Sequence, residues 1–208
     1  MKFKALAAEL FGTFGLSLAV LISINSPGFP VGTPVVAGLT LGLFVYTIGP
    51  ISGCHINPAV TLALAVIRKV DLKTAGSYIV AQFLGAGLAM GVGSLLFAAP
   101  ESLVWASSSS VGAAEALGAM VFLFGIAAVV LGRVPDSMSG MVIGGSLMLG
   151  VLWAAQSSNG VLNPAVAFSL GSMSLAYIWG PILGGAVGAL LGSSLAGSAA
   201  ETDGQVHG

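Results

Sequence analysis

The chain has 208 residues, of which 56% are hydrophobic and only 6% are charged, and its formal net charge is −1. About a quarter of the residues in soluble domains are charged, so this composition excludes an ordinary soluble protein and indicates one embedded in a membrane. The near-neutral charge leaves no basic surface that would attract nucleic acid. Cys54 is the one cysteine, so an internal disulfide is excluded.

Six apolar stretches follow one another along the chain, each long enough to cross a hydrocarbon core about 30 Å thick as a helix. The first follows Lys2 and Lys4. Its run of about 20 apolar residues exceeds the roughly 7–15 of a secretory signal, so we interpret it as a span. We expect the six spans at residues 5–24, 34–51, 74–98, 112–132, 138–156 and 174–196.

The basic residues predict the orientation of these spans. All six fall on one side, before the first span, between the second and third, and between the fourth and fifth. Because cytoplasmic loops are enriched in Lys and Arg, we expect this side and both termini to be cytoplasmic, in a multi-pass protein of the plasma (inner) membrane. The opposite loops carry one charge, Glu101. The six basic residues are Lys2, Lys4, Arg68, Lys69, Lys73 and Arg133.

Two features recur at a single offset. Asn-Pro-Ala-Val occurs at Asn57–Val60 and again 106 residues later at Asn163–Val166, and the glutamates Glu9 and Glu115 are also 106 residues apart. A shared offset indicates an internal duplication. Because each half holds three spans, the second half enters the membrane from the opposite side. We therefore predict an inverted repeat about a pseudo-two-fold axis in the membrane plane.

Each motif opens an apolar segment that is too short to cross the membrane, near 57–67 in the first half and 163–171 in the second. Half-length segments at equivalent positions are typical of re-entrant half-helices. The fold class we expect is an all-α membrane protein with six spans and two half-helices. Its parts are a first repeat, an external linker, a second repeat and a polar tail, at residues 1–98, 99–111, 112–197 and 198–208.

The residue types of the motif favour a pore. Asparagine is a favoured N-cap and proline is favoured at the first helical position, so each motif predicts a helix start. Two half-helices entering from opposite faces would bring their positive N-terminal ends and the asparagine amides together near the midplane. Such a site passes neutral molecules, repels cations and interrupts a proton wire. The residues concerned are Asn57, Pro58 and Ala59, and Asn163, Pro164 and Ala165.

Glu9 and Glu115 allow two interpretations. An acidic residue in a span is by default a functional group, for instance a proton relay. Alternatively, each carboxylate accepts hydrogen bonds from backbone N–H groups of a re-entrant loop that would otherwise have no partner. One glutamate per repeat favours the second interpretation. We expect no metal or cofactor, since the only histidine besides His55 is His207 in the tail.

Longer segments around these landmarks carry a family resemblance. The first half contains AAELFGTF at 7–14, ISGCHINPAVT at 51–61 and AQFLGA at 81–86. The second contains AAEALG, NGVLNPAV and WGPILGGAVG, which begin at Ala113, Asn159 and Trp179. Over essentially its whole length the chain resembles the aquaporin (major intrinsic protein) family. The resemblance implies an hourglass pore, a homotetramer, and support of the re-entrant loops by Glu9, His55, Gln82 and Glu115.

The resemblance also implies where the selectivity filter lies. Water-specific relatives combine an aromatic residue, a histidine, a small residue and an arginine, and these positions correspond here to four filter residues, Ala37, Val151, Gly160 and Val166. All four are small or apolar, so we expect a wide filter with few side-chain hydrogen bonds, suited to larger or less polar solutes than water. The glycerol-conducting relatives usually keep the arginine and follow it with aspartate, where this chain has Ala167.

The favoured function is a passive channel for water and small uncharged solutes such as ammonia, glycerol, urea or hydrogen peroxide. The alternatives are an ion-coupled carrier in which Glu9 or Glu115 carries the proton, and a non-conducting membrane scaffold. No arrangement of residues indicates an enzyme, and the serines at 107–110 are interpreted as linker. We expect backbone carbonyls along the pore wall from Ser52, Gly53, Cys54 and His55, and from Ser158, Asn159, Gly160 and Val161.

Overall fold

A computed structural model of the chain describes residues 3–26, 28, 30–97 and 107–202, and only the backbone of the last seven of these. The described part is helical and contains no strand. Its α-helices are α1 (Phe3–Asn25), α2 (Thr33–Ser52), α3 (Pro58–Val66), α4 (Leu72–Leu96), α5 (Ser109–Val130), α6 (Ser139–Ala154), α7 (Pro164–Ser169) and α8 (Ala176–Thr202), with a 3-10 turn, η1 (Asp136–Met138), before α6.

The six long helices confirm the six expected spans, and each is long and apolar enough to cross a membrane. Two boundaries differ from the expected ones by more than two residues. Helix α5 begins at Ser109 because the Ser108 hydroxyl caps it, accepting from Val111 N at 3.3 Å, so part of the serine run is helical rather than linker. Helix α8 continues to Thr202, beyond the expected end of its span. The expected tail therefore begins as helix. Glu101 and His207 lie outside the described residues.

A tight turn joins α3 to α4, and Asp71 fixes its second half. The Asp71 carboxylate caps α4, accepting from Thr74 Oγ1 at 2.6 Å and from Thr74 N at 2.9 Å. These hydrogen bonds to the charged form hold the Asp71 pKa below its usual value. Arg68 adopts a positive φ of 59° in the same turn. The short helix α3 ends at this turn, and the chain reverses there to begin the full-length span α4.

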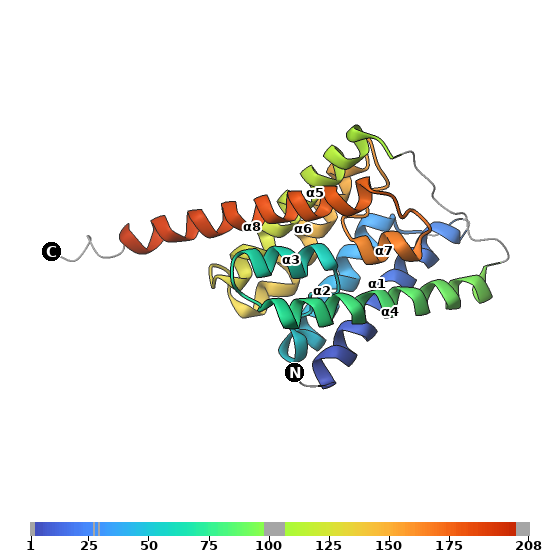
Figure 1. Cartoon of the computed structure of the whole chain (residues 1–208), viewed down its shortest axis with the longest axis horizontal. Helices are drawn as coiled ribbons and strands as arrows, with labels where there is room; N and C mark the ends of the chain where they lie inside the picture. Colours follow the sequence, from blue (N-terminus) through green and yellow to red (C-terminus); the bar gives the residue numbers. More distant parts are fainter. Residues whose placement is uncertain (1–2, 27, 29, 98–106, 203–208) are drawn as a thin grey trace.

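The two halves of the chain pack in the same way. Helix α1 packs against α2 and α4 in the first half, and α5 packs against α6 and α8 in the second. The half-helices cross between halves, because α3 packs against α8 and α7 packs against α4. Figure 1 shows α3 and α7 in line between α4 and α8. This arrangement is an inverted repeat with two re-entrant half-helices.

Helices α2 and α6 join the two halves where glycines allow their backbones to touch. A Cβ added to Gly38 would lie 2.7 Å from the Gly144 carbonyl oxygen, and one added to Gly42 would lie 2.8 Å from the Gly140 oxygen. Small residues permit such close approach between membrane helices. Gly38 and Gly144 are themselves 106 residues apart, so this contact lies on the axis that relates the repeats.

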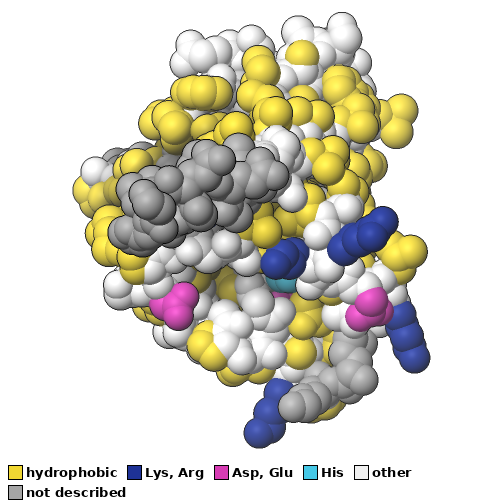
Figure 2. All heavy atoms as spheres, turned by 90° about the vertical axis from the view of Figure 1, so that its left-hand side faces the viewer, with side chains coloured by type: hydrophobic (Ala, Val, Ile, Leu, Met, Phe, Trp, Pro, Cys, Tyr) yellow, Lys and Arg dark blue, Asp and Glu magenta, His cyan; other side chains and the backbone are white. Residues whose placement is uncertain are grey.

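The outer surface is apolar and its charges gather at one end. Leu39 on α2, Leu88 on α4 and Leu183 on α8 are each more than half exposed, which suits a lipid environment. The described Lys and Arg residues lie at the starts of α1 and α4, just after α3 and just after α5. The end of α2 lies at the same end of the molecule, because Tyr78 of α4 donates to Ser52 O and Tyr46 of α2 donates to Ser137 O of η1. We call this the basic end, and Figure 2 shows Lys and Arg side chains on it. Arg133 is tied there by a 3.0 Å hydrogen bond to Gly192 O.

Candidate pore

Two loops lead into the half-helices, a first loop at residues 53–57 and a second loop at 155–163. Asn57 ends the first with extended backbone, and its Oδ1 accepts from Ala59 N at 2.8 Å. Asn163 ends the second, and its Oδ1 accepts from Ala165 N at 3.0 Å and Val166 N at 3.3 Å. Both asparagines are therefore N-caps followed by proline, as the motif predicts.

The same two asparagines hold the loops against each other. Asn57 Nδ2 donates to Leu162 O at 2.9 Å, and Asn163 Nδ2 donates to Ile56 O at 3.1 Å. Each amide nitrogen carries two hydrogens, so this cross-loop bond uses one and leaves the other for a molecule in the cavity that both side chains line. The sequence predicted amides directed at a lumen but not that each would also bind the opposite loop.

Glu9 on α1 serves the first loop. Its Oε1 accepts from Ser52 Oγ at 2.7 Å and His55 N at 2.9 Å, and its Oε2 accepts from Ile56 N at 2.7 Å and Gln82 Nε2 at 2.8 Å. The side chain is fully buried. Unpaired backbone N–H groups would be costly here. The carboxylate therefore satisfies two backbone donors that the irregular loop leaves open.

Glu115 on α5 repeats this arrangement in the second loop. Its Oε1 accepts from Ser158 Oγ at 2.7 Å and Val161 N at 3.0 Å, and its Oε2 accepts from Leu162 N at 2.6 Å. The Ser158 hydroxyl also accepts from Gly160 N at 2.9 Å, just as Ser52 accepts from Cys54 N at 3.1 Å. Every one of these partners lies 106 residues from its counterpart in the other repeat.

Both loops take up the same unusual backbone shape. In the first, Cys54 and Ile56 have φ of 52° and 37°, and in the second, Gly160 and Leu162 have φ of 61° and 55°. A positive φ is strained for a β-branched residue such as Ile56 and costs on the order of 1–3 kcal/mol. The hydrogen bonds to the glutamates and asparagines offset that cost, so the loop shape depends on them.

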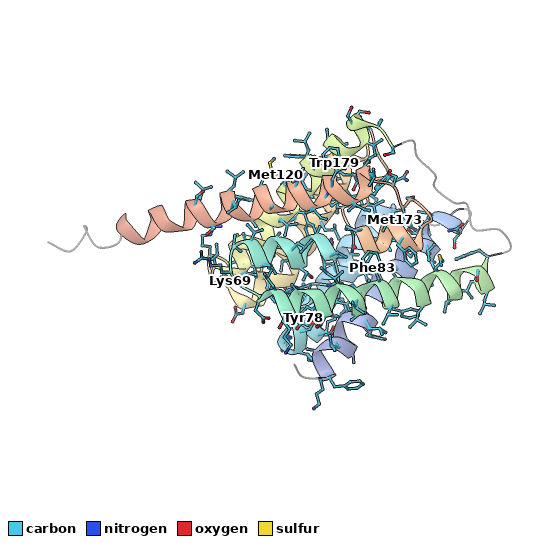
Figure 3. All side chains as sticks on the ribbon, in the orientation of Figure 1. Lys69, Tyr78, Phe83, Met120, Met173 and Trp179 are labelled. Carbon is cyan, nitrogen blue, oxygen red and sulfur yellow. The ribbon has the colours of Figure 1, made fainter. Side chains whose placement is uncertain are left out.

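Further side chains tie the loops to the spans. His55 Nδ1 lies 3.2 Å from Thr61 Oγ1, which also accepts from Gln82 Nε2 at 2.9 Å. Tyr78, which Figure 3 labels on α4, donates its OH to Ser52 O at 2.9 Å, and Tyr177 OH accepts from Asn159 N at 3.0 Å. Sequence reasoning named His55 and Gln82 but missed Thr61 and the two tyrosines. No repeat signal marked the tyrosines, because neither has a tyrosine 106 residues away.

A cavity of about 240 Å³ lies between the loops and spans. It extends from Ile24 and Thr33, at the end opposite the basic end, to Asn57 and Asn163. Most of the wall is aliphatic or aromatic, including Leu16, Val20, Leu41, Phe122, Leu147 and Leu170.

All four filter residues, Ala37, Val151, Gly160 and Val166, line this cavity, and so do His55, Asn159 and Val161 of the expected pore wall. The other wall residues do not line it. They are Ser52, Gly53, Cys54 and Ser158.

The lining contains no charged side chain. Its polar groups are a few amides, one hydroxyl, one imidazole and loop backbone, while the carboxylates of Glu9 and Glu115 are turned into the loops. Within the described residues, no group of three or more His, Cys, Asp or Glu side chains is close enough together to hold a metal ion. The site can therefore hold an uncharged molecule against an apolar wall with a few hydrogen-bonding groups.

These features define a multi-pass membrane protein with a pore between two re-entrant half-helices. The chain belongs to the major intrinsic protein family, whose model matches residues 1–195. Members of this family are channels rather than enzymes, so the chain is a passive channel for water or small solutes.

Relatives from plants and bacteria agree with this assignment. Aquaporin NIP1-1 of Zea mays is 34% identical over 205 residues, covering 91% of this chain and 72% of the relative. Aquaporin Z of Rhodopseudomonas palustris is 32% identical over 215 residues, covering 88% and 90%. Among solved structures, the aquaglyceroporin of Plasmodium falciparum has the same fold, with a TM-score of 0.66 at 21% identity over 92% of this chain and 94% of that one.

Proposed function

We propose that the channel admits water together with small uncharged solutes, and that its selectivity filter is an apolar ring without the arginine of water-specific relatives. The observation that carries the proposal is that Ala37, Val151, Gly160 and Val166 line one cavity, and that none of their side chains has a hydrogen-bonding group. A water molecule that enters such a ring loses hydrogen bonds to other waters, and the side chains of the ring offer none to replace them. Solutes such as ammonia, urea, glycerol or hydrogen peroxide therefore compete well with it.

Exclusion of cations rests on the asparagines and half-helices in this proposal. The N-terminal ends of α3 and α7 carry partial positive charge, and both face the cavity where Asn57 and Asn163 lie. The remaining amide N–H groups orient the oxygen of a passing water toward themselves, which interrupts a proton wire. Without a filter arginine, these groups supply the electrostatic barrier by themselves.

The contacts of Glu9 and Glu115 support a channel over an ion-coupled carrier. Both carboxylates accept hydrogen bonds on each oxygen from loop groups and line no part of the cavity. Protonating either one would break bonds that hold the pore loops, whereas a carrier needs a carboxylate that can exchange its proton. A continuous cavity reaching both asparagines likewise favours conduction over a scaffold role.

Orientation and assembly complete the proposal. The basic end faces the cytoplasm, because the described Lys and Arg residues lie there and cytoplasmic loops carry the excess of cations. Both termini are then cytoplasmic, and the membrane is the plasma (inner) membrane. The assembly is a homotetramer, as the family resemblance implies, with one pore in each protomer.

Stopped-flow light scattering on proteoliposomes tests the proposed function. An impermeant osmolyte should cause fast shrinkage through the protein. Gradients of urea or glycerol should give shrinkage followed by re-swelling as the solute enters. Imposing a pH gradient should leave both rates unchanged, since nothing is coupled to protons. Solute uptake that follows the pH gradient would overturn the channel in favour of a carrier, and the absence of any protein-dependent flux would favour a scaffold.

A further inference from the structure

The repeat makes it possible to locate the counterpart of the filter on the other side of the asparagines. The loop contacts of Glu9 and Glu115 show that equivalent residues of the two repeats are 106 residues apart in the sequence. For α2 and α6 the same offset is fixed by the contact of Gly38 with Gly144. The offset therefore applies to all the elements that bear the filter residues.

Applying this offset gives four residues. Ile143 corresponds to Ala37, Val45 to Val151, Cys54 to Gly160, and Val60 to Val166. We call these four the inner ring. Cys54 and Val60 belong to the first loop and α3, and Val45 and Ile143 lie on α2 and α6 toward the basic end. The inner ring thus lies between the asparagines and the basic end.

The cavity is not symmetric about the asparagines. Four repeat-related pairs line it with both members: Leu16 with Phe122, Leu41 with Leu147, His55 with Val161, and Asn57 with Asn163. All four filter residues line it, whereas none of the inner ring does. The open space therefore passes the filter, reaches the asparagines and ends before the inner ring.

The inner ring has bulkier side chains than the filter. Relative to its filter counterpart, Ile143 adds three carbons to Ala37 and Cys54 adds a whole side chain to Gly160, while the valines match. Burial does not distinguish the two rings, because Cys54, Val60 and Ile143 are 5%, 3% and 8% exposed and the filter residues Ala37, Val151 and Val166 are 6%, 7% and 4% exposed. The difference between the rings is therefore the bulk of Ile143 and Cys54. Hydrophobic constrictions of this kind impede permeation by excluding water.

We propose that the inner ring, rather than the filter, is the narrowest part of the pore and sets the size of the solutes that pass. The inference rests on the proposed function, since it concerns the same pathway. It assigns a specificity-determining role to the side chains of Ile143 and Cys54. The sequence analysis marks Cys54 only for its pore-wall backbone and does not mark Ile143. The filter then admits solutes to a vestibule, and the inner ring decides which of them leave it.

Reciprocal variants test this assignment by urea and glycerol flux in proteoliposomes. Ile143→Ala gives the inner ring the alanine of its filter counterpart and should raise solute flux on the order of tenfold. Ala37→Ile gives the filter the isoleucine of its inner-ring counterpart and should lower the flux by a smaller factor than Ile143→Ala raises it, because the inner ring already limits the flux. Leu183→Ala also removes three carbons, from an α8 side chain that is 56% exposed and does not line the cavity, and should leave the flux at its native value. Size-exclusion profiles confirm that each variant is folded.

The outcomes separate this inference from the proposed function. If native protein conducts urea and Ile143→Ala raises the flux, the inner ring is limiting. Should Ala37→Ile reduce the flux while Ile143→Ala leaves it unchanged, the filter is limiting and the inference is wrong, although the channel stands. If only the widened variant Ile143→Ala conducts, the inner ring is a closed constriction, which also supports the inference. If native protein, the Ile143→Ala variant and the double variant Ile143→Ala with Cys54→Gly all fail to conduct, both this inference and the proposed function are wrong.

Discussion

Asn57 and Asn163 each donate a side-chain N–H to the carbonyl that precedes the other asparagine. Asn57 Nδ2 lies 2.9 Å from Leu162 O, and Asn163 Nδ2 lies 3.1 Å from Ile56 O. Each side chain at the same time caps its own half-helix through Oδ1. Two reciprocal hydrogen bonds therefore join the starts of α3 and α7, and the position of each half-helix depends on the other.

Replacing Asn163 by aspartate tests the electrostatic part of this arrangement. Aspartate keeps the capping oxygen but cannot donate to Ile56 O, and it adds a negative charge to a lining that has none. We expect proton flux through Asn163→Asp to exceed that of native protein, measured with a pH-sensitive dye trapped in proteoliposomes under a potassium potential. Asn163→Ala removes the same donor without the charge. Equal proton flux in both variants would show that charge is not the cause.

Glu9→Gln separates loop support from proton coupling. A glutamine amide nitrogen cannot accept, so one backbone N–H loses its acceptor whichever oxygen the nitrogen replaces: His55 N at the Oε1 position or Ile56 N at the Oε2 position. An unsatisfied buried donor costs about 1–3 kcal/mol. We expect a lower thermal unfolding temperature in detergent and no change in how flux depends on a pH gradient. A variant that unfolds like native protein but loses pH-driven uptake would contradict the support role.

The crossing of α2 and α6 offers a test with a control one residue away. A Cβ on Gly144 would press on the Gly38 backbone, whereas a Cβ on Gly145 meets nothing within 4 Å. We expect Gly144→Ala to destabilise the protein by about 1–3 kcal/mol through overpacking. Gly145→Ala should be neutral or stabilising by up to about 1 kcal/mol, as alanine favours helix. Thermal unfolding in detergent compares them, and equal stability would refute the close crossing.

The single thiol offers a chemical probe of the inner ring. Cys54 is 5% exposed and lies one residue before His55, which lines the cavity. Mercury bound to Sγ would fill the constriction, so we expect mercuric chloride to slow solute flux through native protein. Cys54→Ser should conduct and resist the reagent. Persistent inhibition of that variant would contradict the assignment, because the chain has no second cysteine.

Much of this architecture follows from two repeated landmarks. The shared offset of Glu9 and Glu115 with the two asparagines predicted the inverted repeat, and Asn-Pro predicted the helix starts that α3 and α7 show. These predictions succeed because capping and repeat symmetry are local properties that sequence spacing records. The six spans were equally readable, since their length and apolar content are set by the bilayer.

Other features depend on tertiary packing and could not be predicted from the sequence. Tyr177 holds the second loop through Asn159 N, yet nothing in its spacing separates it from an ordinary apolar-span residue. Ser52 and Ser158 were predicted only to contribute backbone carbonyls to the pore wall, whereas their hydroxyls bridge each glutamate to its loop. Their common offset could have revealed this role. The one-sided cavity depends on how α2 packs on α6, where Gly38 contacts Gly144.

The central claim is that the filter is an apolar ring open to uncharged solutes, and Val166→Arg tests it most directly. Val166 is 4% exposed and lines the cavity, so an arginine there would occupy the ring and present hydrogen-bond donors to it. Stopped-flow light scattering should show that urea and glycerol re-swelling is strongly reduced in this variant, while shrinkage under an impermeant osmolyte persists. Unchanged solute re-swelling in a folded Val166→Arg protein would contradict the account, because the solutes would then be taking a path that avoids Val166.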